Sequence, residues 1–513
     1  MIYELKPLFY LMDAFTIKNR LEKYNNTYIV ESISDVDKII HNISEELKLD
    51  INTVKHALSK YSYIFYGNLI VDTNNKTNNS YNTLIVSFNR QISLPIRHNG
   101  INTVFGPFGT DWIHDVQKDD DVNTHDVIRR RKQFHKLDSI QYPAQRSKEW
   151  YVQRDGKITA SDAGVVLGEN KYEQPYRMIV KKTRETFQNN EATYHGKKHE
   201  DIAKLIYEYR MNVRIKEFGM VEHPDVKCIG ASPDGIVTPF KNDGVHLTCL
   251  VGRMLEIKVP LRRQICTTGE VKGDICPIYY WDQVQLQMEC CDLDECDFWQ
   301  CTISEYPSRD IFINDTCLTE PFRSKLSSFE KGCLVQILPK NKIVQHDHPD
   351  YINVVHEYAN FIHPPKIEMT PEECDKWTNS VIANLKTTHP NYDFDRIIYW
   401  FLKVGHCVTI QRNKKWFDDN KHKYEEMWKY ITLIRSSDKY KETFLNFVDA
   451  TSMGDRDYDI EPIRNKIIFK FIDKLEKNSE KILNLIGIWN NKLKAVRTKN
   501  ELKKLLCDLD EIM

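Results

Sequence analysis

Two short stretches decide the fold of the middle of the chain: GASPDGIV (Gly230–Val237) and MLEIKVP (Met254–Pro260). In the second stretch, Glu256 and Lys258 stand two residues apart among Met, Leu, Ile and Val, which predicts a strand with both side chains on one face. In the first stretch, Gly, Ser and Pro predict a turn that places Asp234 at the start of a further strand. Antiparallel pairing of these strands would bring Asp234, Glu256 and Lys258 together.

Two carboxylates beside an ammonium group suit the hydrolysis of a phosphodiester. Mg²⁺ binds oxygen ligands and usually takes only a few carboxylates, which leaves positions for water and phosphate. A bound ion lowers the pKa of water and neutralises charge on a phosphoryl group. Lys258 would orient that water or help to deprotonate it, and it could also bind phosphate as a point charge. An isolated Glu-x-Lys pair is more often a surface salt bridge. The choice between a salt bridge and a nuclease site therefore depends on the surrounding motifs.

Three further motifs occur around this pair: QRSKEWYVQRDGKITASDAGVVLG (Gln145–Gly168), HGKKHEDIAKLIYEY (His195–Tyr209) and YYWDQVQLQME (Tyr279–Glu289). With the PD…ExK pair they resemble, in the same order, YqaJ-type viral recombinases, which belong to the lambda-exonuclease family of the PD-(D/E)xK nuclease superfamily. The resemblance ends near Phe298 and covers roughly a third of the chain. It implies an α/β core, a mixed sheet flanked by helices.

The resemblance assigns a role to each motif residue. Metal would be held by the carboxylates of Glu200, Asp234 and Glu256 and by the backbone carbonyl of Ile257. Lys258 would position the attacking water. The catalytic set that follows comprises Glu200, Asp234, Glu256, Lys258 and Gln283. The cofactor implied is Mg²⁺, with two ions favoured and Mn²⁺ as a substitute.

A pocket for the 5′-phosphate of a DNA end is also implied. Its members are Arg154, Ser161, Ser232, Lys258 and Gln283, and Tyr280 and Gln285 belong to the same helix motif. An arginine fork and hydroxyl groups suit phosphate oxygens. Each residue has a plainer interpretation: Arg154 as a surface ion pair, and Ser161 as the cap of the helix that begins SDAGVV. Of the alternating Gln283, Gln285 and Gln287, at most two can face inward.

The function that the resemblance implies is a DNA exonuclease acting 5′→3′ on duplex ends and leaving 3′ single strands, in viral recombination, replication or repair. A single-strand-annealing protein and a second copy of the chain are the expected partners, beside double-stranded DNA ends. The amino-acid composition and the residues after the glutamine helix look more like members of the family from large DNA viruses than like phage members. The alternatives are an endonuclease on the same core and a non-catalytic DNA-binding or packaging protein.

Outside these motifs, composition and periodicity divide the chain. Residues 1–115 are expected to form an α+β domain of unknown role, with helices over 34–47 and 51–60 and a hairpin made by Asn68–Val71 and Thr83–Phe88. Two helices and a hairpin fit a small winged-helix-like DNA module or, as the favoured interpretation, a packing or partner-binding domain. Residues 116–140 swing from acidic KDDDV to basic IRRRKQFHK, which is typical of a charged linker, although such a basic run can also contact DNA.

The exonuclease domain is expected over 141–345 and a helical domain over 346–513. The helices of the latter are predicted from apolar periodicity over Trp377–Leu385, Phe394–Val404, Tyr424–Ile434, Ile463–Leu475 and Ile482–Leu493. The 513 residues hold 72 Lys plus Arg against 73 Asp plus Glu. This balance removes the whole-chain argument for nucleic-acid binding but does not describe any one groove.

Thirteen cysteines in a chain of this length do not form the framework of a small secreted protein. Eight of them lie between Cys228 and Cys301, but the spacing CC-x4-C-x4-C does not match zinc sites, so buried thiols are favoured over metal ligands. No apolar run approaches the roughly 18 residues that a membrane span needs, and Leu8–Met12 is too short for a signal peptide. An intracellular location is expected, in the host cytoplasm or nucleus if the protein is viral.

Overall fold

A seven-stranded mixed sheet forms the centre of the protein. The computed structural model describes residues 122–184, 191–452, 459–476 and 498–512, together with short segments within 27–103 and 488–496. Across the sheet, the strands run in the order β14 (Asn360–Ile362), β13 (Lys331–Pro339), β15 (Tyr392–Gln411), β12 (Glu295–Glu305), β11 (Met254–Lys258), β10 (Gly235–Val237) and β7 (Ile215–Lys216). Only the β11–β12 pair among these strands is parallel. The expected α/β class with a mixed sheet is confirmed.

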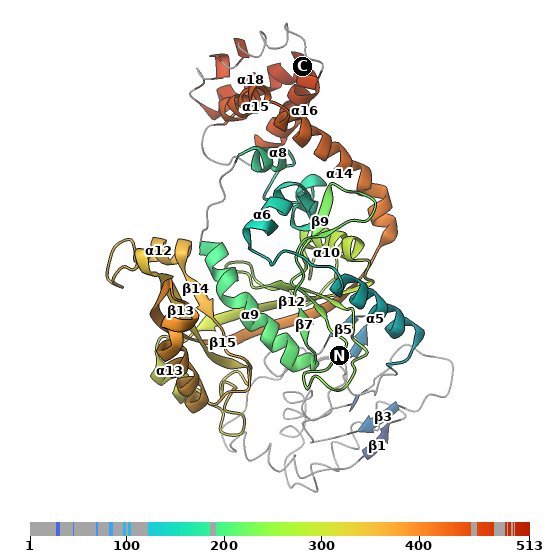
Figure 1. The fold of residues 1–513 in the computed structure, drawn as a ribbon. Helices are drawn as coiled ribbons and strands as arrows, with labels where there is room; N and C mark the ends of the chain where they lie inside the picture. Colours follow the sequence, from blue (N-terminus) through green and yellow to red (C-terminus); the bar gives the residue numbers. More distant parts are fainter. Residues whose placement is uncertain are drawn as a thin grey trace.

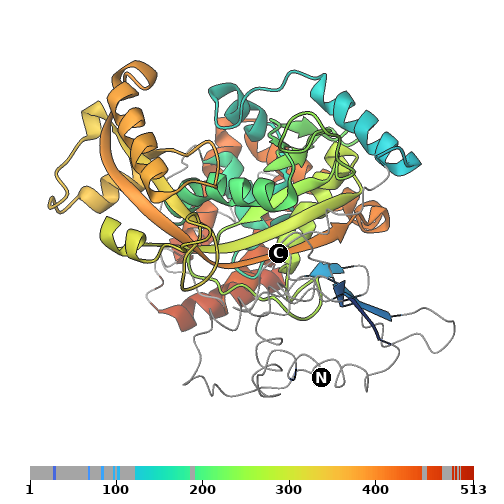
Figure 2. The ribbon, with the colours of Figure 1, turned by 90° about the horizontal axis from the view of Figure 1, so that it is seen from below.

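Helices cover both faces of this sheet (Figure 1). Successive residues of β11 pack into different hydrophobic cores. Met254 packs in the cluster that contains Val284 of α10 (Ile278–Cys291), whereas Leu255 packs in the cluster that contains Ile202 of α9 (Glu191–Met211). Side chains alternate between the faces of a strand, so α9 and α10 lie on opposite sides of β11. Seen from below, the yellow-green β12 and the orange β15 cross the middle of the molecule side by side (Figure 2).

A small second sheet, in the order β6 (Ile158–Thr159), β9 (Ile229–Ala231) and β8 (Val221–Glu222), packs against α10. Its β9 strand leads into the turn before β10. Four short helical elements precede β9 in the chain: α6 (Lys148–Asp155), the 3₁₀ turn η1 (Ala160–Asp162), α7 (Ala163–Val166) and α8 (Tyr176–Thr183). The remaining elements between β12 and β15 are α11 (Arg309–Asn314), η2 (Lys340–Lys342), α12 (Tyr351–Tyr358) and α13 (Pro371–Thr388).

The strand pairing in the N-terminal part agrees with the sequence. β2 (Asn68–Leu69) pairs antiparallel with β3 (Asn82–Ile85), which confirms the predicted hairpin, and β1 (Thr27–Val30) adds to the other side of β3. A further antiparallel pair is β4 (Ile96–His98) with β5 (Ile101–Thr103). The helices predicted over 34–47 and 51–60 lie outside the described residues, except for Glu45, which is helical.

The helical interpretation of Phe394–Val404 is wrong, because this segment lies within the strand β15, which pairs with both β12 and β13. Its run of aromatic and branched residues is apolar on both faces, and such a run suits a strand buried between two neighbours as well as a buried helix. The sheet therefore continues to Gln411, well past the expected start of a helical domain at 346. The domain boundaries themselves stay a prediction.

The other C-terminal helices are confirmed where they are described. Trp377–Leu385 lies in α13, Tyr424–Ile434 in α14 (Lys414–Arg435), and Ile463–Leu475 in α16 (Glu461–Glu476). Most of Ile482–Leu493 falls outside the described residues. The helices α15 (Asp438–Ala450), α16 and α18 (Lys499–Ile512) gather at one end of the molecule, next to α8 (Figure 1). No helix in the described part of the chain is long and apolar enough to cross a membrane.

The charged segment 116–140 is not a linker where it is described, because most of it is the helix α5 (His125–Asp138). Thr124 caps its N-terminus, and Val127, Phe134 and Leu137 are buried against the core. Two residues of its basic run hold acidic residues around the start of β12: Arg129 pairs with Asp294, and Arg130 pairs with Glu295 at 2.8 Å.

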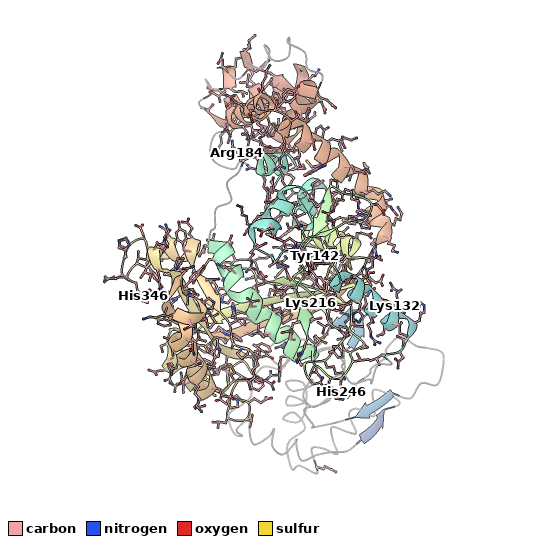
Figure 3. All side chains as sticks on the ribbon, viewed as in Figure 1. Lys132, Tyr142, Arg184, Lys216, His246 and His346 are labelled. Carbon is pink, nitrogen blue, oxygen red and sulfur yellow. The ribbon has the colours of Figure 1, made fainter. Side chains whose placement is uncertain are left out.

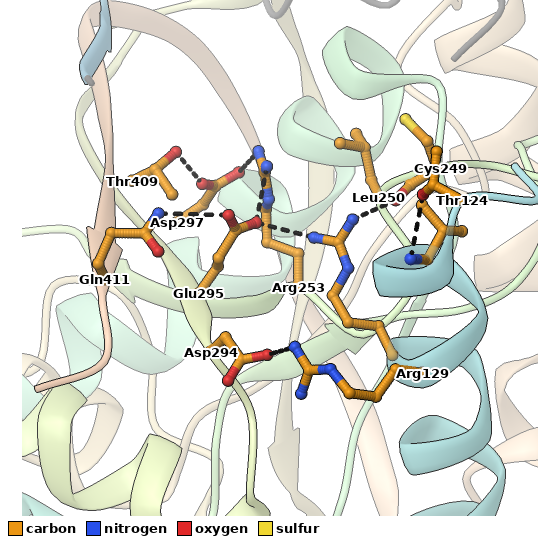
Figure 4. A network of polar contacts seen from close by, with 12 residues as sticks. Thr124, Arg129, Cys249, Leu250, Arg253, Asp294, Glu295, Asp297, Thr409 and Gln411 are labelled. Atoms are coloured by element: carbon orange, nitrogen blue, oxygen red, sulfur yellow. Dashed lines mark hydrogen bonds and ion pairs between the residues drawn. The ribbon is translucent and has the colours of Figure 1, made fainter. Parts of the chain in front are cut away.

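The contacts of Arg130 belong to a polar network that ties α5 to the central sheet (Figure 4). Glu295 also accepts from Arg253, which stands just before β11, at 3.0 Å. Arg253 in turn lies 3.5 Å from Asp297, which accepts from Thr409 of β15. These arginines pair with acidic residues of the scaffold. Lys132 remains exposed on the outer side of α5 (Figure 3).

The packing of α5 predicts a large stability effect for Phe134→Ala. Phe134 is 3% exposed, and its ring meets that of Phe218 edge-on with 5.9 Å between the centroids. Removing the ring should lower the free energy of unfolding by about 3–4 kcal/mol, measured by urea titration. The matched change Lys132→Ala on the exposed side of the same helix should be nearly neutral. Equal effects of the two changes would contradict the docking of α5.

Candidate active site

The predicted pair of strands delivers its carboxylates to one place. β10 pairs antiparallel with β11 in a register that sets Gly235 opposite Leu255, so Asp234 stands next to Glu256. The carboxylate of Asp234 accepts the backbone N–H of Ile257 at 2.7 Å. This bond fixes the Asp234 side chain directly before the first residue of β10, just past the last residue pair that joins β10 to β11.

The carbonyl of Ile257 faces the same edge. In a strand, the N–H and C=O groups of one residue point to the same side, and the N–H of Ile257 points to Asp234. Since β10 begins at Gly235, the carbonyl lies beyond the last ladder pair between the two strands. Its direction is the one expected of a backbone ligand beside the Asp234 carboxylate.

Glu256 is completely buried, and each of its oxygens accepts hydrogen bonds. Oε1 accepts from Gln283 at 2.6 Å and from the ammonium group of Lys258, and Oε2 accepts from Gln287 at 2.7 Å. Gln283 and Gln287 are four residues apart on α10 and therefore share a face of that helix. Two of the three alternating glutamines point inward, as expected.

Gln285, the third of them, does not belong to this group. Its amide nitrogen donates to the carbonyl of Gln411 at 2.9 Å, and its oxygen accepts from the backbone N–H of Asn413 at 2.7 Å. Gln285 therefore fastens α10 to the connection between β15 and α14. Gln287 was missing from the predicted site, although its i+4 spacing from Gln283 was a signal that could have found it.

Burial and mutual repulsion shift the pKa values of the carboxylates. Burial raises the pKa of Asp234 well above its usual range, and the charges of Glu256 and Glu200 raise it further. The side chain of Glu200 is only partly buried; desolvation is the chief cause that raises its pKa, while Arg146 acts in the opposite direction. The negative charge of neighbouring carboxylates contributes to both shifts. A cation among them would remove that repulsion.

Lys258 is held as a cation. Burial by itself would lower its pKa, but Glu256, Tyr280 and Asp234 together raise it above the usual lysine range. Its nitrogen lies 4.7 Å from the ring centroid of Tyr280, and the guanidinium of Arg263 lies 5.7 Å from the same centroid. A charged Lys258 suits the binding of a phosphate or the orientation of water.

The residues predicted for the 5′-phosphate form a second, neighbouring group. Arg154 of α6 donates to the hydroxyl of Ser161 at 2.9 Å, and its guanidinium lies 5.1 Å from the ring centroid of Trp150. The indole N–H of Trp150 donates to Ser232 at 2.9 Å. Ser232 stands two residues before Asp234, so the turn before β10 joins this group to the carboxylates.

Two plainer interpretations of these residues can be compared with the structure. Ser161 contacts Arg154 and Thr159, and the helix α7 has no side-chain cap, so Ser161 is not used as a helix cap. Arg154 donates to a hydroxyl, and no carboxylate within the described segments forms an ion pair with it. Beyond the active strand, Arg262 pairs with Glu191 and is largely exposed, whereas Arg263 donates to Gln300 at 2.7 Å.

The donor set fits a hard divalent ion better than a soft one. It consists of three carboxylates and a backbone carbonyl, which are the oxygen ligands that Mg²⁺ prefers. Nevertheless, no three His, Cys, Asp or Glu side chains of the described residues are already grouped to hold a metal ion. Glu200 is turned to Arg146, which donates to both of its oxygens at 3.2 and 3.3 Å. The metal therefore remains a prediction.

Five of the eight cysteines between Cys228 and Cys301 are buried, and the other three are partly exposed. The thiols are free in the described part of the chain, and Cys290, Cys291, Cys296 and Cys301 are buried. Burial raises the pKa of Cys291 to about 12, so its thiol stays protonated. The preference for buried thiols over metal ligands agrees with this environment.

Comparison with known proteins now identifies the segment that carries these residues. Residues 149–294 match the family described as YqaJ-like viral recombinase domain. This segment is similar to YqaJ-like viral recombinase domains. The match spans Arg154, all three carboxylates and the glutamine helix, and it begins shortly after Arg146.

Two relatives extend the comparison. The chain is 38% identical over 340 residues to the uncharacterized protein R354 of Acanthamoeba polyphaga mimivirus, which covers 66% of this chain and 61% of that protein. It is 30% identical over 97 residues to the uncharacterized protein YqaJ of Bacillus subtilis (strain 168), covering 18% of this chain and 30% of that protein. The chain thus spans about three fifths of the first relative and under a third of the second.

Solved structures give weaker likenesses. A crystal structure of an alkaline exonuclease (LHK-Exo) from Laribacter hongkongensis is 26% identical and covers 30% of this chain and 74% of that chain, with a TM-score of 0.23. The same enzyme in complex with dAMP is 23% identical over the same coverage, also with a TM-score of 0.23. A TM-score this low does not support a conclusion about the fold or function of this chain.

The hydrogen bonds of Glu256 predict the effect of Gln287→Leu. This change leaves Oε2 of a fully buried carboxylate without its donor, which should lower the free energy of unfolding by about 1–3 kcal/mol. In a Glu256→Leu background the same change should cost much less, because no charge is left unsatisfied. A double-mutant cycle by urea titration measures the difference. Equal costs in both backgrounds would show that Gln287 does not serve Glu256.

Proposed function

We propose that the protein is a Mg²⁺-dependent DNA exonuclease that degrades duplex ends 5′→3′ and leaves 3′ single strands. The observation that carries the proposal is the placement of Asp234, Glu256 and Lys258 on adjoining strands, within a segment that matches a viral recombinase domain. Carboxylates where β10 and β11 meet, with a lysine beside them, suit phosphodiester hydrolysis. Viral recombination, replication or repair is the process in which such ends are used.

Glu200, Asp234, Glu256 and the Ile257 carbonyl are the groups that would hold the metal, with two Mg²⁺ ions favoured and Mn²⁺ as a substitute. When bound, the metal supplies a more acidic water and charge neutralisation at the phosphate. The chain supplies the rest. Gln283 and Gln287 keep Glu256 oriented from the α10 side, and Lys258 holds the phosphate or the attacking water as a fixed cation.

The end of the DNA would be recognised by the group around Arg154. Arg154 has further guanidinium N–H groups to offer a phosphate beside the one that binds Ser161. Ser161 and Ser232 are hydroxyl donors of the same group, and Lys258 and Gln283 stand on the side of Glu256. A charged pocket for a terminal phosphate would favour phosphorylated 5′ ends and keep the enzyme on the strand that it shortens.

Two other functions are compatible with this core. An endonuclease would use the same carboxylates on an internal site, and a non-catalytic DNA-binding or packaging protein would keep the fold alone. Every catalytic position is filled, which favours catalysis. A single-strand-annealing protein to accept the 3′ strand, and association with further copies of this chain, belong to the proposal as expected partners. The cytoplasm or nucleus of a host cell is the expected location.

The proposal predicts which DNA is degraded. With Mg²⁺, the full chain should digest an end-labelled linear duplex and leave a covalently closed circle intact, and chelation of the metal should stop the reaction. Asp234→Ala and Lys258→Ala should each lower the rate about a thousandfold or more, since each removes a group at the reacting phosphate. The surface changes Asp508→Ala and Lys132→Ala serve as matched controls. Cutting of the circle would support the endonuclease, and undiminished digestion by either active-site variant would refute the assigned site.

The phosphate pocket gives a separate prediction. The wild-type chain should digest 5′-phosphorylated duplex faster than 5′-hydroxyl duplex, and Arg154→Ala should remove most of that preference. Arg184→Ala, which alters an exposed arginine that pairs with Asp449, should leave the preference as it is. Initial rates on the two substrates measure the ratio directly. A preference that persists in Arg154→Ala would mean that the end is recognised elsewhere.

A further inference from the structure

Arg146 has an unusual backbone conformation. It lies three residues before the segment 149–294 that matches the family. Its φ is +67°, in the left-handed region that residues with a side chain seldom adopt. Glycine would adopt this conformation without strain, yet the chain has an arginine there. A strained arginine beside an active site suggests that its side chain serves a purpose.

The neighbours of Arg146 hold this conformation in place. The amide of Gln145 donates to the carbonyl of Phe218 at 2.8 Å and to the carbonyl of Pro233 at 3.1 Å. On the other side, Ser147 caps α6 by accepting the N–H of Trp150 at 3.2 Å. Pro233 immediately precedes Asp234, so the segment that presents Arg146 is fastened to the turn that presents a catalytic carboxylate.

The side chain of Arg146 ends on Glu200. One guanidinium nitrogen donates to both carboxylate oxygens, at 3.2 and 3.3 Å. The Arg146 side chain is 49% exposed and that of Glu200 is 38% exposed, so the pair can open without unpacking a core. Exposed pairs of this kind are weak and are easily exchanged for another partner.

We propose that Arg146 is the counter-ion of Glu200 in the ion-free protein and that a divalent cation displaces it. This inference rests on the proposed function, because it concerns the same carboxylates. With Glu200 bound to Arg146, no three acidic side chains in the described part of the chain are grouped as ligands. Exchange of the arginine for an ion completes the group and releases a guanidinium beside the site, where it can bind DNA phosphate.

The exchange can be measured without any nuclease assay. Mn²⁺ binding to the full chain is followed by isothermal titration calorimetry, in the absence of DNA. Arg146→Gln removes the competing cation and should tighten Mn²⁺ binding by about fivefold. The same variant should gain more in melting temperature on adding Mn²⁺ than the wild type does, because Glu200 has lost its arginine partner and the metal takes its place.

Arg262→Gln is the matched control. It also removes an exposed arginine from an ion pair, but the partner is Glu191. Its Mn²⁺ affinity should equal that of the wild type. If Arg146→Gln binds Mn²⁺ no more tightly than Arg262→Gln, the counter-ion role is refuted while the metal site stands. If the wild type shows no saturable Mn²⁺ binding, or if Asp234→Ala binds as tightly as the wild type, the metal site of the proposed function is refuted as well.

Discussion

The burial of Glu256 is the constraint on which the rest of the site depends. A carboxylate in the middle of a sheet, with no exposed surface, is costly unless its charge is balanced and both oxygens accept hydrogen bonds. Lys258, Gln283 and Gln287 meet that need, two from α10 and one from β11 itself. The position of α10 across the sheet is thereby coupled to one buried carboxylate of β11. Asp234 and Glu200 then add negative charge next to a group that is already balanced.

The scaffold around Glu256 extends much further along the chain than the family match. Arg253, just before β11, contacts Glu295 and Asp297 of β12, and Asp297 also accepts from Tyr207 of α9 at 2.8 Å. Through Arg130, the helix α5 joins the same network, and β15 completes the sheet from a segment beyond residue 390. The elements that carry Glu200 and Glu256 are thus held by residues outside the motifs.

Local pattern predicted the pairing of β10 with β11 well, because alternation and turn residues act within a few positions of Asp234 and Glu256. Local pattern failed where residues far away in the chain determine the secondary structure or the contacts of a side chain. The apolar run of β15 reads equally as helix or strand until β12 and β13 flank it, and the arginines of α5 look solvated until Asp294 and Glu295 are placed opposite them. Arg146 was quoted in a motif but carried no signal of its own, since its role arises from a left-handed backbone and from a helix some fifty residues away.

Glu200, Asp234 and Glu256 are proposed to form one cation site at the start of β10. The most direct measurement is the anomalous diffraction of Mn²⁺ in crystals of the full chain. The account predicts a peak bounded by the three carboxylates and the Ile257 carbonyl, with the Arg146 guanidinium moved off Glu200. A peak that lies elsewhere, or none at saturating Mn²⁺ with Arg146 still on Glu200, would contradict it.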